Sequence, residues 1–498
     1  MLRVFVSIGF LQAVAIVINA VRAKVFAVLL GPAGLGVVAT IDQLVVSVSQ
    51  FFHLSLPKTA LRFLSRDHSL SEERFRRSYA HFLQATVALA MLAPVVLFLF
   101  LPSHLASLDP ELGKYRSPVS IALLGIPATM LVIFFVHVFA ARQKPVHSAL
   151  VIAISAALGA VFGTGGCLLG GISGIYLALV PASTALAVLL IWYARARMNL
   201  PLRAPAGNEK HRFKIDREIV ETGAANYIAI ACYSGFVLFT RYLSIAELSE
   251  EAAGFLQAGL AIALSVGGVL SPVSQLYLAP NLNRVVPTEV KNESIDRFLP
   301  RLVLLYSVAA LPVMLFPEFA LKILFSDRFI AAANIVRALL IWQCLFQIAT
   351  VYQQHLIGFD HIRVFAAATL AAYVTAGALS VALTGSLGLN GIAVAFAASA
   401  LIIIGSAAVY FRLRNERGLP KQIAVFNISA LLGLTGTIAI GNWTSEVAVG
   451  GILLRLSYGA VVLLTLFALL PKSVRAELFE SAIARTRELL GRKSPALP

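Results

Sequence analysis

Charged side chains inside long apolar segments are the residues of this chain with the clearest chemical potential. Arg22, Lys24, Asp42 and Arg241 all lie in such segments. A charge at the centre of a bilayer costs roughly 2.5–3.5 kcal/mol on insertion scales, so we expect each of them to face a polar interior or an opposite charge. Two cations across a cleft suit an anionic group such as a pyrophosphate, and Asp42 can pair with one of them.

Polar side chains accompany these charges at helical spacing. Gln12, Asn19 and Arg22 fall on one face of a helix, and Asp42 and His53 share a face of the next one. The second half of the chain carries polar stripes of the same kind. We therefore expect a shared cavity lined by eight substrate-binding residues: Arg22, Lys24, Asp42, Arg241, Gln12, Asn19, Gln257 and Gln347.

Asp42 and His53 are the candidates for exchanging a proton. Each candidate has a plainer interpretation that the sequence leaves open. His53 can be a packed, hydrogen-bonded residue, Lys24 can serve only as a structural partner of Asp42, and Arg241 can extend to the membrane interface. Arg337 is expected at that interface. A further cation in the last apolar segment, Arg455, receives no role.

Enzyme motifs are missing from the sequence. It contains no P-loop glycine–lysine signature and no HExxH, CxxC or GxSxG motif. The three cysteines form no metal-binding or disulfide spacing. The longest loop expected on the outer side, 102–117, is too short for a catalytic domain. We therefore expect no enzyme activity, no cofactor and no metal site.

Long apolar segments define the fold class. Hydrophobic residues make up 59% of the chain and charged residues 13%, with a mean hydropathy of +0.85. About 20 apolar residues are enough to cross a bilayer as a helix. The sequence predicts an all-α integral membrane protein with about 14 transmembrane helices. The expected spans are 4–30, 35–60, 79–101, 118–141, 148–169, 172–194, 218–244, 252–280, 298–317, 332–356, 363–385, 390–410, 422–441 and 447–470.

Basic residues set the expected orientation. Most of the 40 Lys and Arg residues fall in loops on one side of the predicted membrane, and cytoplasmic loops are the ones that collect such residues. Both termini are therefore expected in the cytoplasm. The net charge of +16 then reflects a basic face beside anionic lipid, and not nucleic-acid binding, because the basic residues are spread over many loops.

The chain repeats itself at a spacing of about 217 residues. The segment 171–175 returns as 388–392, for example. Repeats in the same orientation are typical of transporters that hold substrate between two halves and alternate access to it. We expect five regions: a six-helix bundle at 1–194, a linker at 195–217, a second bundle at 218–411, two additional helices at 412–471 and a cytoplasmic amphipathic tail at 472–498.

Three segments carry a family resemblance. Residues 24–36 (KVFAVLLGPAGLG) resemble the first-loop signature of Wzx-type polysaccharide flippases. Residues 325–329 (FSDRF) resemble a second element of that family, and 253–257, running on to 280–282, a third. The resemblance covers nearly all of 1–410, and it is greatest to flippases of enterobacterial-common-antigen type within the multidrug/oligosaccharidyl-lipid/polysaccharide superfamily.

The resemblance implies a function. Such proteins move undecaprenyl-pyrophosphate-linked oligosaccharides from the inner to the outer leaflet of the bacterial inner membrane, for O-antigen, lipopolysaccharide or other surface polysaccharides. Lys24 and Arg241 stand where the family tends to carry cations, whereas Asp42 departs from its pattern. Expected partners are the lipid-linked glycan, membrane lipid and a polysaccharide polymerase or chain-length regulator. The alternatives are a cation-coupled drug exporter of the same superfamily and a membrane-embedded glycosyltransferase or polymerase.

Overall fold

A computed structural model describes residues 2–108, 115–142, 144–203, 217–268, 270, 278, 282, 287–414, 420–443, 449–472 and 474–476. Within these residues the secondary structure is helical, with no strand. Eleven of the helices, or twelve if one bent pair counts as one span, are long and apolar enough to cross a membrane. The all-α membrane fold expected from the sequence is thereby confirmed.

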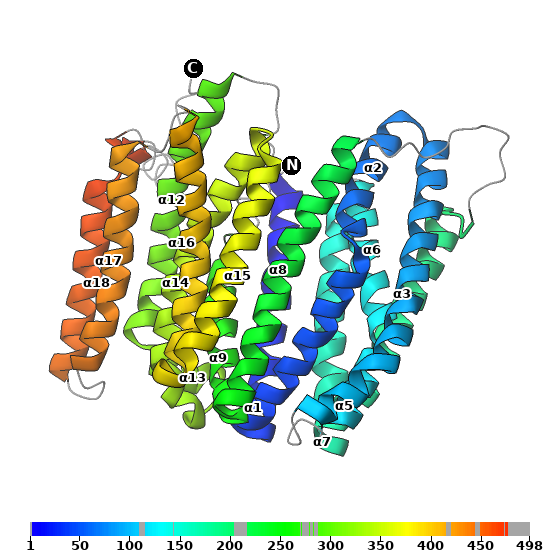
Figure 1. Ribbon diagram of the computed structural model, residues 1–498, viewed down its shortest axis with the longest axis horizontal. Coiled ribbons are helices and arrows are strands. Elements are labelled where there is room, and N and C mark those ends of the chain that lie inside the picture. Colours follow the sequence, from blue (N-terminus) through cyan, green and yellow to red (C-terminus); the bar gives the residue numbers. More distant parts are fainter. Residues whose placement is uncertain are drawn as a thin grey trace, which may run out of the picture. The chain divides into compact units, whose positions relative to one another are not determined.

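The chain forms two compact units (Figure 1). Unit 1 comprises Met1–Ala258, Leu321–Ala332 and Thr369–Ile392. Within it α1 packs against α7 and α8, and α6 packs against α2, α3 and α7. Its elements are α1 (Leu2–His53), α2 (Leu56–Leu70), α3 (Glu72–Leu108), α5 (Arg116–Leu123), α6 (Ile126–Ala141), α7 (Pro145–Met198), α8 (Arg217–Glu247) and η2 (Asp327–Ala332), with most of α15 (Ile362–Leu387) and the start of α9 (Glu250–Gly268).

Unit 2 comprises Gly259–Ala320, Ala333–Ala368 and Ala393–Pro498. In this unit α12 packs against α14, and the last two helices, α17 and α18, pack on each other and on α12. Its elements are α12 (Thr288–Leu315), the first half of α13 (Pro317–Leu324), α14 (Ala333–Gly358), α16 (Leu389–Leu413), α17 (Lys421–Trp443) and α18 (Val449–Leu469), with the end of α9. The five regions predicted from the repeat follow other boundaries and stay a prediction.

Two helices are long enough for more than one crossing. The apolar part of α1 spans 41 residues and that of α7 spans 53 residues. At about 1.5 Å per residue, each exceeds a hydrocarbon core of about 30 Å roughly twofold. Both helices break at glycine, α1 at Gly31 and α7 at Gly170 and Gly171. These breaks lie where the sequence predicts boundaries between spans, although the count of 14 crossings stays a prediction.

The turn at Gly171 occurs twice in unit 1. Gly171 and Gly388, which the sequence repeat aligns, have φ angles of +58° and +57°. Three residues later in each copy the backbones approach closely: a Cβ on Gly174 would lie 2.2 Å from the Gly166 carbonyl oxygen, and one on Gly391 would lie 2.6 Å from that of Leu383. Only glycine fits such contacts, so the shared sequence produces a shared turn geometry.

We expect Gly171→Ala to destabilise the fold by about 1–2 kcal/mol, because a side chain at positive φ strains the backbone. The neighbouring Gly170 is the matched control, since its φ is −152° and a Cβ there would meet nothing within 4 Å. Unfolding in mixed micelles measures both variants. Equal losses for Gly170→Ala and Gly171→Ala would contradict the conformational explanation.

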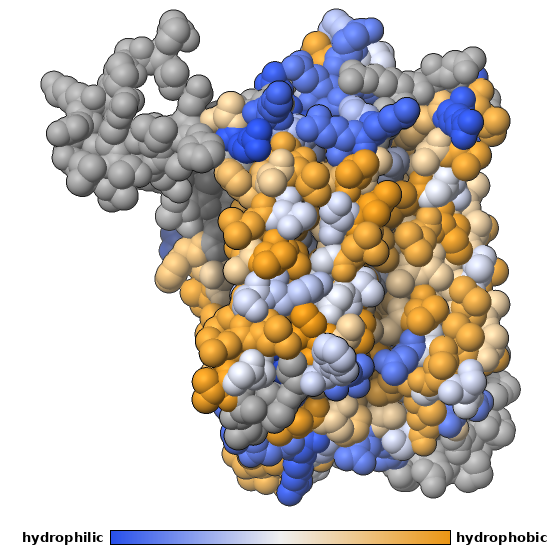
Figure 2. All heavy atoms as spheres, turned by 90° about the vertical axis from the view of Figure 1, so that its left-hand side faces the viewer, coloured by the Kyte–Doolittle hydropathy of each residue, from blue (hydrophilic) through white to orange (hydrophobic). Residues whose placement is uncertain are grey.

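The surface of the helices is apolar, as a bilayer requires. Figure 2 shows the side that carries α17 and α18, where hydrophobic side chains cover most of the middle and hydrophilic ones gather at the two ends. Leu432 and Leu464, on these two helices, are 67% and 69% exposed. In contrast, the interior of unit 1 has fully buried aromatic rings, such as those of Phe75, Tyr79 and Phe134. The chain is a multi-pass membrane protein.

Candidate functional site

The break in α1 brings Arg22 and Asp42 together. Gly31 has φ +68° and ψ −173°, a conformation that side chains strongly disfavour, and Pro32 follows it. The two halves of α1 therefore run back along each other. Arg22, on the first half, donates from Nη2 to Oδ2 of Asp42, on the second half, at 2.7 Å. The pairing expected between Asp42 and one of the cations is thus made by Arg22.

Three further groups hold this ion pair. The Tyr176 hydroxyl, on the second half of α7, lies 3.1 Å from Oδ1 of Asp42 and 3.1 Å from the Val38 carbonyl oxygen. The Arg22 guanidinium lies 5.1 Å from the centre of the Phe26 ring, within the range of a cation–π contact. On its other side it passes Gly159, where a Cβ would come within 3.2 Å of Nη1. The absence of a side chain at Gly159 therefore leaves room for the guanidinium.

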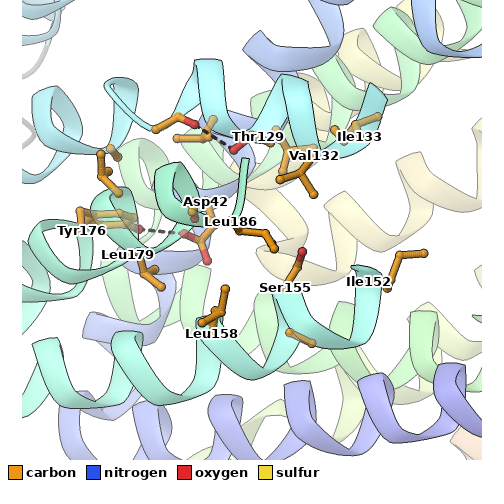
Figure 3. Close-up of a pocket in the computed structure, with 18 of the residues that line it drawn as sticks. Asp42, Thr129, Val132, Ile133, Ile152, Ser155, Leu158, Tyr176, Leu179 and Leu186 are labelled. Carbon is orange, nitrogen blue, oxygen red and sulfur yellow. Dashed lines mark hydrogen bonds between the residues drawn. The ribbon is translucent and has the colours of Figure 1, made fainter. Parts of the chain in front are cut away.

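The ion pair lines a cavity of about 490 Å³ in unit 1. Figure 3 shows Asp42 and Tyr176 in its wall, joined by their hydrogen bond, with Thr129 and Ser155 further along it. The hydroxyls of Thr129 and Ser155 donate to carbonyl oxygens of their own helices, so each keeps lone pairs that can accept a hydrogen bond. Asn19 also lines the cavity. The walls combine one ion pair, hydrogen-bonding groups and apolar surface.

A second cation interacts with the same carboxylate. Arg241, on α8, is only 7% exposed and interacts electrostatically with Asp42 and Tyr233. Its Nε is buried without a hydrogen-bond partner among the described residues. α8 is fixed beside α1 by Ser234, whose hydroxyl lies 2.9 Å from that of Ser47. Asp42 thus accepts a hydrogen bond from one guanidinium and attracts a second electrostatically, so that one carboxylate offsets two positive charges.

Other predicted site residues lie elsewhere. Lys24 is exposed and donates to the Ile323 carbonyl oxygen at 2.6 Å, in the last turn of α13, where a cation interacts favourably with the helix dipole. It does not join Arg22 at Asp42. His53 is 3% exposed and its Nε2 lies 3.0 Å from the Met130 carbonyl oxygen, the geometry of the packed interpretation.

The predicted glutamines have other surroundings. Gln347 is buried in unit 2 and donates to the Gly267 carbonyl oxygen at 3.1 Å. Gln257, in unit 1, has a buried Oε1 without a partner among the described residues. The side chain of Gln12 lies outside the described residues, as do residues 109–114 and most of the tail predicted at 472–498. Of the predicted set, Asn19, Arg22 and Asp42 line one cavity, and Arg241 interacts electrostatically with Asp42.

A second charged cluster, in unit 2, was not predicted. Arg337 and Arg455 are 2% and 1% exposed in their side chains, and both pair with Glu318. Arg337 is thus enclosed by protein and ion-paired, and its expected depth at the membrane interface stays a prediction. Arg455 also donates to the Leu315 carbonyl oxygen at 2.9 Å. Both arginines bind the carboxyl end of α12, where unpaired carbonyl oxygens and the helix dipole attract cations. The sequence carries no signal for pairing residues this far apart.

The signature segments of the sequence also meet, at one end of unit 1. A Cβ on Gly254 would lie 1.9 Å from the Pro32 carbonyl oxygen. The ring centroids of Phe255 and Phe329 lie 6.1 Å apart in an edge-on contact. A Cβ on Gly31 would come within 3.5 Å of Arg328. Residues from all three segments that carry the family resemblance thus pack against one another beside the break in α1.

Solved structures with this arrangement are membrane transporters. The lipid II flippase MurJ, in an inward closed conformation, is 13% identical with a TM-score of 0.68, over 92% of this chain and 97% of that chain. An inward-facing multidrug resistance MATE family transporter of the MOP superfamily is 13% identical with a TM-score of 0.61, over 82% and 98%. The MATE multidrug transporter DinF-BH is 17% identical with a TM-score of 0.59, over 82% and 94%.

These likenesses identify the fold. The chain has the architecture shared by MATE transporters and the MurJ flippase, and these neighbours are transporters and not enzymes. No protein-family model matches the chain, and no curated protein is detectably similar to it in sequence.

Proposed function

We propose that this protein is a flippase that carries a polyprenyl-pyrophosphate-linked oligosaccharide from the inner to the outer leaflet of a bacterial cytoplasmic membrane, with both termini in the cytoplasm. The observation that carries the proposal is the charge around Asp42, which is hydrogen-bonded to Arg22 and also attracts the buried Arg241 electrostatically, so that two guanidinium groups depend on one carboxylate. A net positive charge inside membrane spans is costly unless an anion neutralises it. A pyrophosphate has the charge to do so.

The chemistry of the cavity fits the head of such a substrate. Arg22 can form two parallel hydrogen bonds to a phosphate, a geometry that a guanidinium favours. Thr129, Ser155 and Asn19 offer acceptors to sugar hydroxyls along the same cavity. Apolar wall residues such as Leu179 and Leu186 suit the apolar faces of sugar rings. No bond is made or broken, so the side chains act only by binding and releasing the head group.

Binding requires Arg22 to change partner. In the structure its guanidinium is paired with Asp42. The side chain of Arg22 is 21% exposed and that of Asp42 is 37% exposed. An anion in the cavity competes with Asp42 for it. The same carboxylate can recover the guanidinium when the anion leaves, which favours release over permanent binding. This exchange is the step on which we expect transport to depend.

The test is translocation in sealed vesicles that contain the purified protein. A fluorescent short-chain polyprenyl-pyrophosphoryl disaccharide is followed to the far leaflet. Arg22→Ala and Arg241→Ala should each slow transfer about ten- to a hundredfold, the worth of one charge-assisted hydrogen bond. The matched control is Arg297→Ala, which removes an arginine from an exposed pair with Glu293 and should leave the rate unchanged. Transfer by both site variants at the wild-type rate would contradict the proposal.

The likeness to MATE transporters supports a second candidate, a cation-coupled exporter of small molecules. The site argues against it, because both oxygens of Asp42 already have partners and the surrounding net charge repels a cationic drug. The same vesicles distinguish the two functions. Efflux of a cationic dye driven by a proton gradient, without transfer of the lipid-linked sugar, would establish the exporter instead.

The resemblance in sequence supports a proposal for the class of glycan. Because the segments 24–36, 253–257 and 325–329 resemble Wzx-type flippases, we propose a surface-polysaccharide precursor of the O-antigen or enterobacterial-common-antigen kind as the substrate. A polymerase or chain-length regulator of that polysaccharide is the proposed protein partner. Accumulation of the undecaprenyl-linked precursor in the inner leaflet after deletion of the gene would test this assignment.

A further inference from the structure

The two carboxylate oxygens of Asp42 have different kinds of partner. Oδ2 accepts from Arg22, whose side chain also lines the cavity, where an anion can bind it. Oδ1 lies 3.1 Å from the hydroxyl of Tyr176, a side chain that is 3% exposed. Figure 3 shows this second contact across the wall of the cavity. One partner of Asp42 can therefore leave while the other stays.

Tyr176 is held firmly in this place. It follows the close crossing of Gly166 and Gly174, where the two backbones touch and neither side can move apart without breaking the turn. Its hydroxyl also lies 3.1 Å from the Val38 carbonyl oxygen, one helical turn before Asp42 on α1. Because the hydroxyl has a single proton, the Val38 carbonyl oxygen and Oδ1 of Asp42, which lie on the same helix, share it.

When an anion captures Arg22, Asp42 loses its ion-pair partner. Asp42 is 37% exposed in its side chain, so the loss of Arg22 is offset in part by water, but it still destabilises a carboxylate in a cavity with apolar walls. The hydroxyl of Tyr176 removes part of that penalty, because it can still donate to Oδ1. Because this bond is present in the free site as well, anion binding is favoured only by its strengthening once the carboxylate has lost Arg22, and Tyr176 need not touch the anion.

We propose that Tyr176 is a positioning residue for anion binding, which acts through Asp42: its hydroxyl stabilises the carboxylate after Arg22 has transferred to the anion. This inference rests on the proposed function, in which Arg22 binds a pyrophosphate. The hydroxyl affects the equilibrium between two states, a closed pair in which Arg22 is bound to Asp42 and an occupied site in which Arg22 is bound to the anion. Its removal favours the closed pair and weakens substrate binding.

The experiment measures binding of farnesyl pyrophosphate to the full-length protein in lipid nanodiscs. Tyr176→Phe should raise the dissociation constant about three- to tenfold, because the bond to Asp42 is present in both states and only its strengthening in the occupied site is lost. Asp42→Asn should bind more tightly than the wild type, because the competitor for Arg22 is gone. In the Asp42→Asn background, Tyr176→Phe should change the dissociation constant less than about twofold, since no carboxylate remains to be stabilised.

The matched control is Tyr79→Phe. Tyr79 is fully buried in unit 1, and its hydroxyl has no hydrogen-bond partner among the described residues. This variant should bind as the wild type does. In the transport assay, Tyr176→Phe should raise the half-saturating substrate concentration and leave the maximal rate nearly unchanged, a split that a general loss of fold would not produce.

The outcomes separate the two proposals. No binding of farnesyl pyrophosphate by the wild type, or binding that survives Arg22→Ala, overturns the proposed function and this inference with it. Binding that needs Arg22 but is unchanged in Tyr176→Phe overturns only the role of Tyr176. An equal loss for Tyr176→Phe with and without Asp42→Asn would also overturn it, because the hydroxyl would then act directly on the ligand or on the fold.

Discussion

Glu318→Gln should destabilise unit 2 by about 3–5 kcal/mol, the cost of removing one partner from a buried ion pair. Glu318 is the carboxylate to which both Arg337 and Arg455 are paired, at 3.0 Å and 3.7 Å. Its amide analogue keeps the shape but leaves two buried guanidinium groups facing each other without a compensating charge. The free energy of unfolding in mixed micelles measures the loss.

The location of the cluster explains why the effect should be large. Arg337 donates from Nε to the Met314 carbonyl oxygen at 3.0 Å, and Arg455 donates to that of Gly441 at 3.3 Å. A Cβ on Gly441 would lie 2.5 Å from Cζ of Arg337, so the helices meet closely around the charges. The cluster therefore joins α17 and α18 to α12 and α14, and it gives Arg455 a structural role in the last helix.

The control is a pair of the same chemistry in water. Glu293 and Arg297 lie 2.5 Å apart, 58% and 50% exposed in their side chains. An exposed pair contributes about 0–1 kcal/mol, so Glu293→Gln should have little effect. Equal losses of stability in Glu318→Gln and Glu293→Gln would show that the buried cluster stabilises the protein no more than an exposed pair does. A double variant, Glu318→Gln with Arg455→Met, should lose less than the sum of its parts.

Apolar periodicity predicted the helices well because every transmembrane backbone must satisfy its own hydrogen bonds. The breaks near Gly31 and Gly170 were also readable, since glycine at these points interrupts long apolar segments. The pairing of Arg22 with Asp42, however, depends on the angle of the break in α1. The sequence shows both residues and cannot show which cation, Arg22 or Lys24, turns toward the carboxylate.

Residues that act through tertiary contacts were missed for a related reason. A tyrosine in an apolar segment, such as Tyr176, reads as ordinary packing, and only the fold shows its hydroxyl beside Asp42. Arg455 contacts the Leu315 and Gly441 carbonyl oxygens, and backbone acceptors carry no sequence signal at all. Conversely, Gln347 was predicted to bind substrate because it belongs to a polar stripe. In the structure it donates to a backbone oxygen, and a glutamine in that role occupies the same helical positions as one that binds a ligand.

Gly254→Val should destabilise unit 1 by about 3 kcal/mol or more, because a side chain there would overlap the main chain of α1. Its Cβ would lie 1.9 Å from the carbonyl oxygen of Pro32 and 2.5 Å from the carbonyl carbon. The opposing contact is equally tight, since a Cβ on Gly36 would lie 2.4 Å from the Glu250 carbonyl oxygen. A main-chain atom cannot rotate away as a side chain can, so the two helices must separate.

The consequence should extend to the site. The contact of Gly254 with Pro32 fixes the break in α1, and that break sets the position of Arg22 relative to Asp42. We therefore expect Gly254→Val to lower both the free energy of unfolding and the affinity for a pyrophosphate.

Gly377→Ala is the matched control, because Gly377 lies within α15 in the same unit and a Cβ there would meet nothing within 4 Å. Alanine in a helix interior stabilises by up to about 1 kcal/mol relative to glycine, so the two substitutions should differ in sign. Stability and pyrophosphate affinity that are both unchanged in Gly254→Val would show that the signature segments do not hold the break in α1.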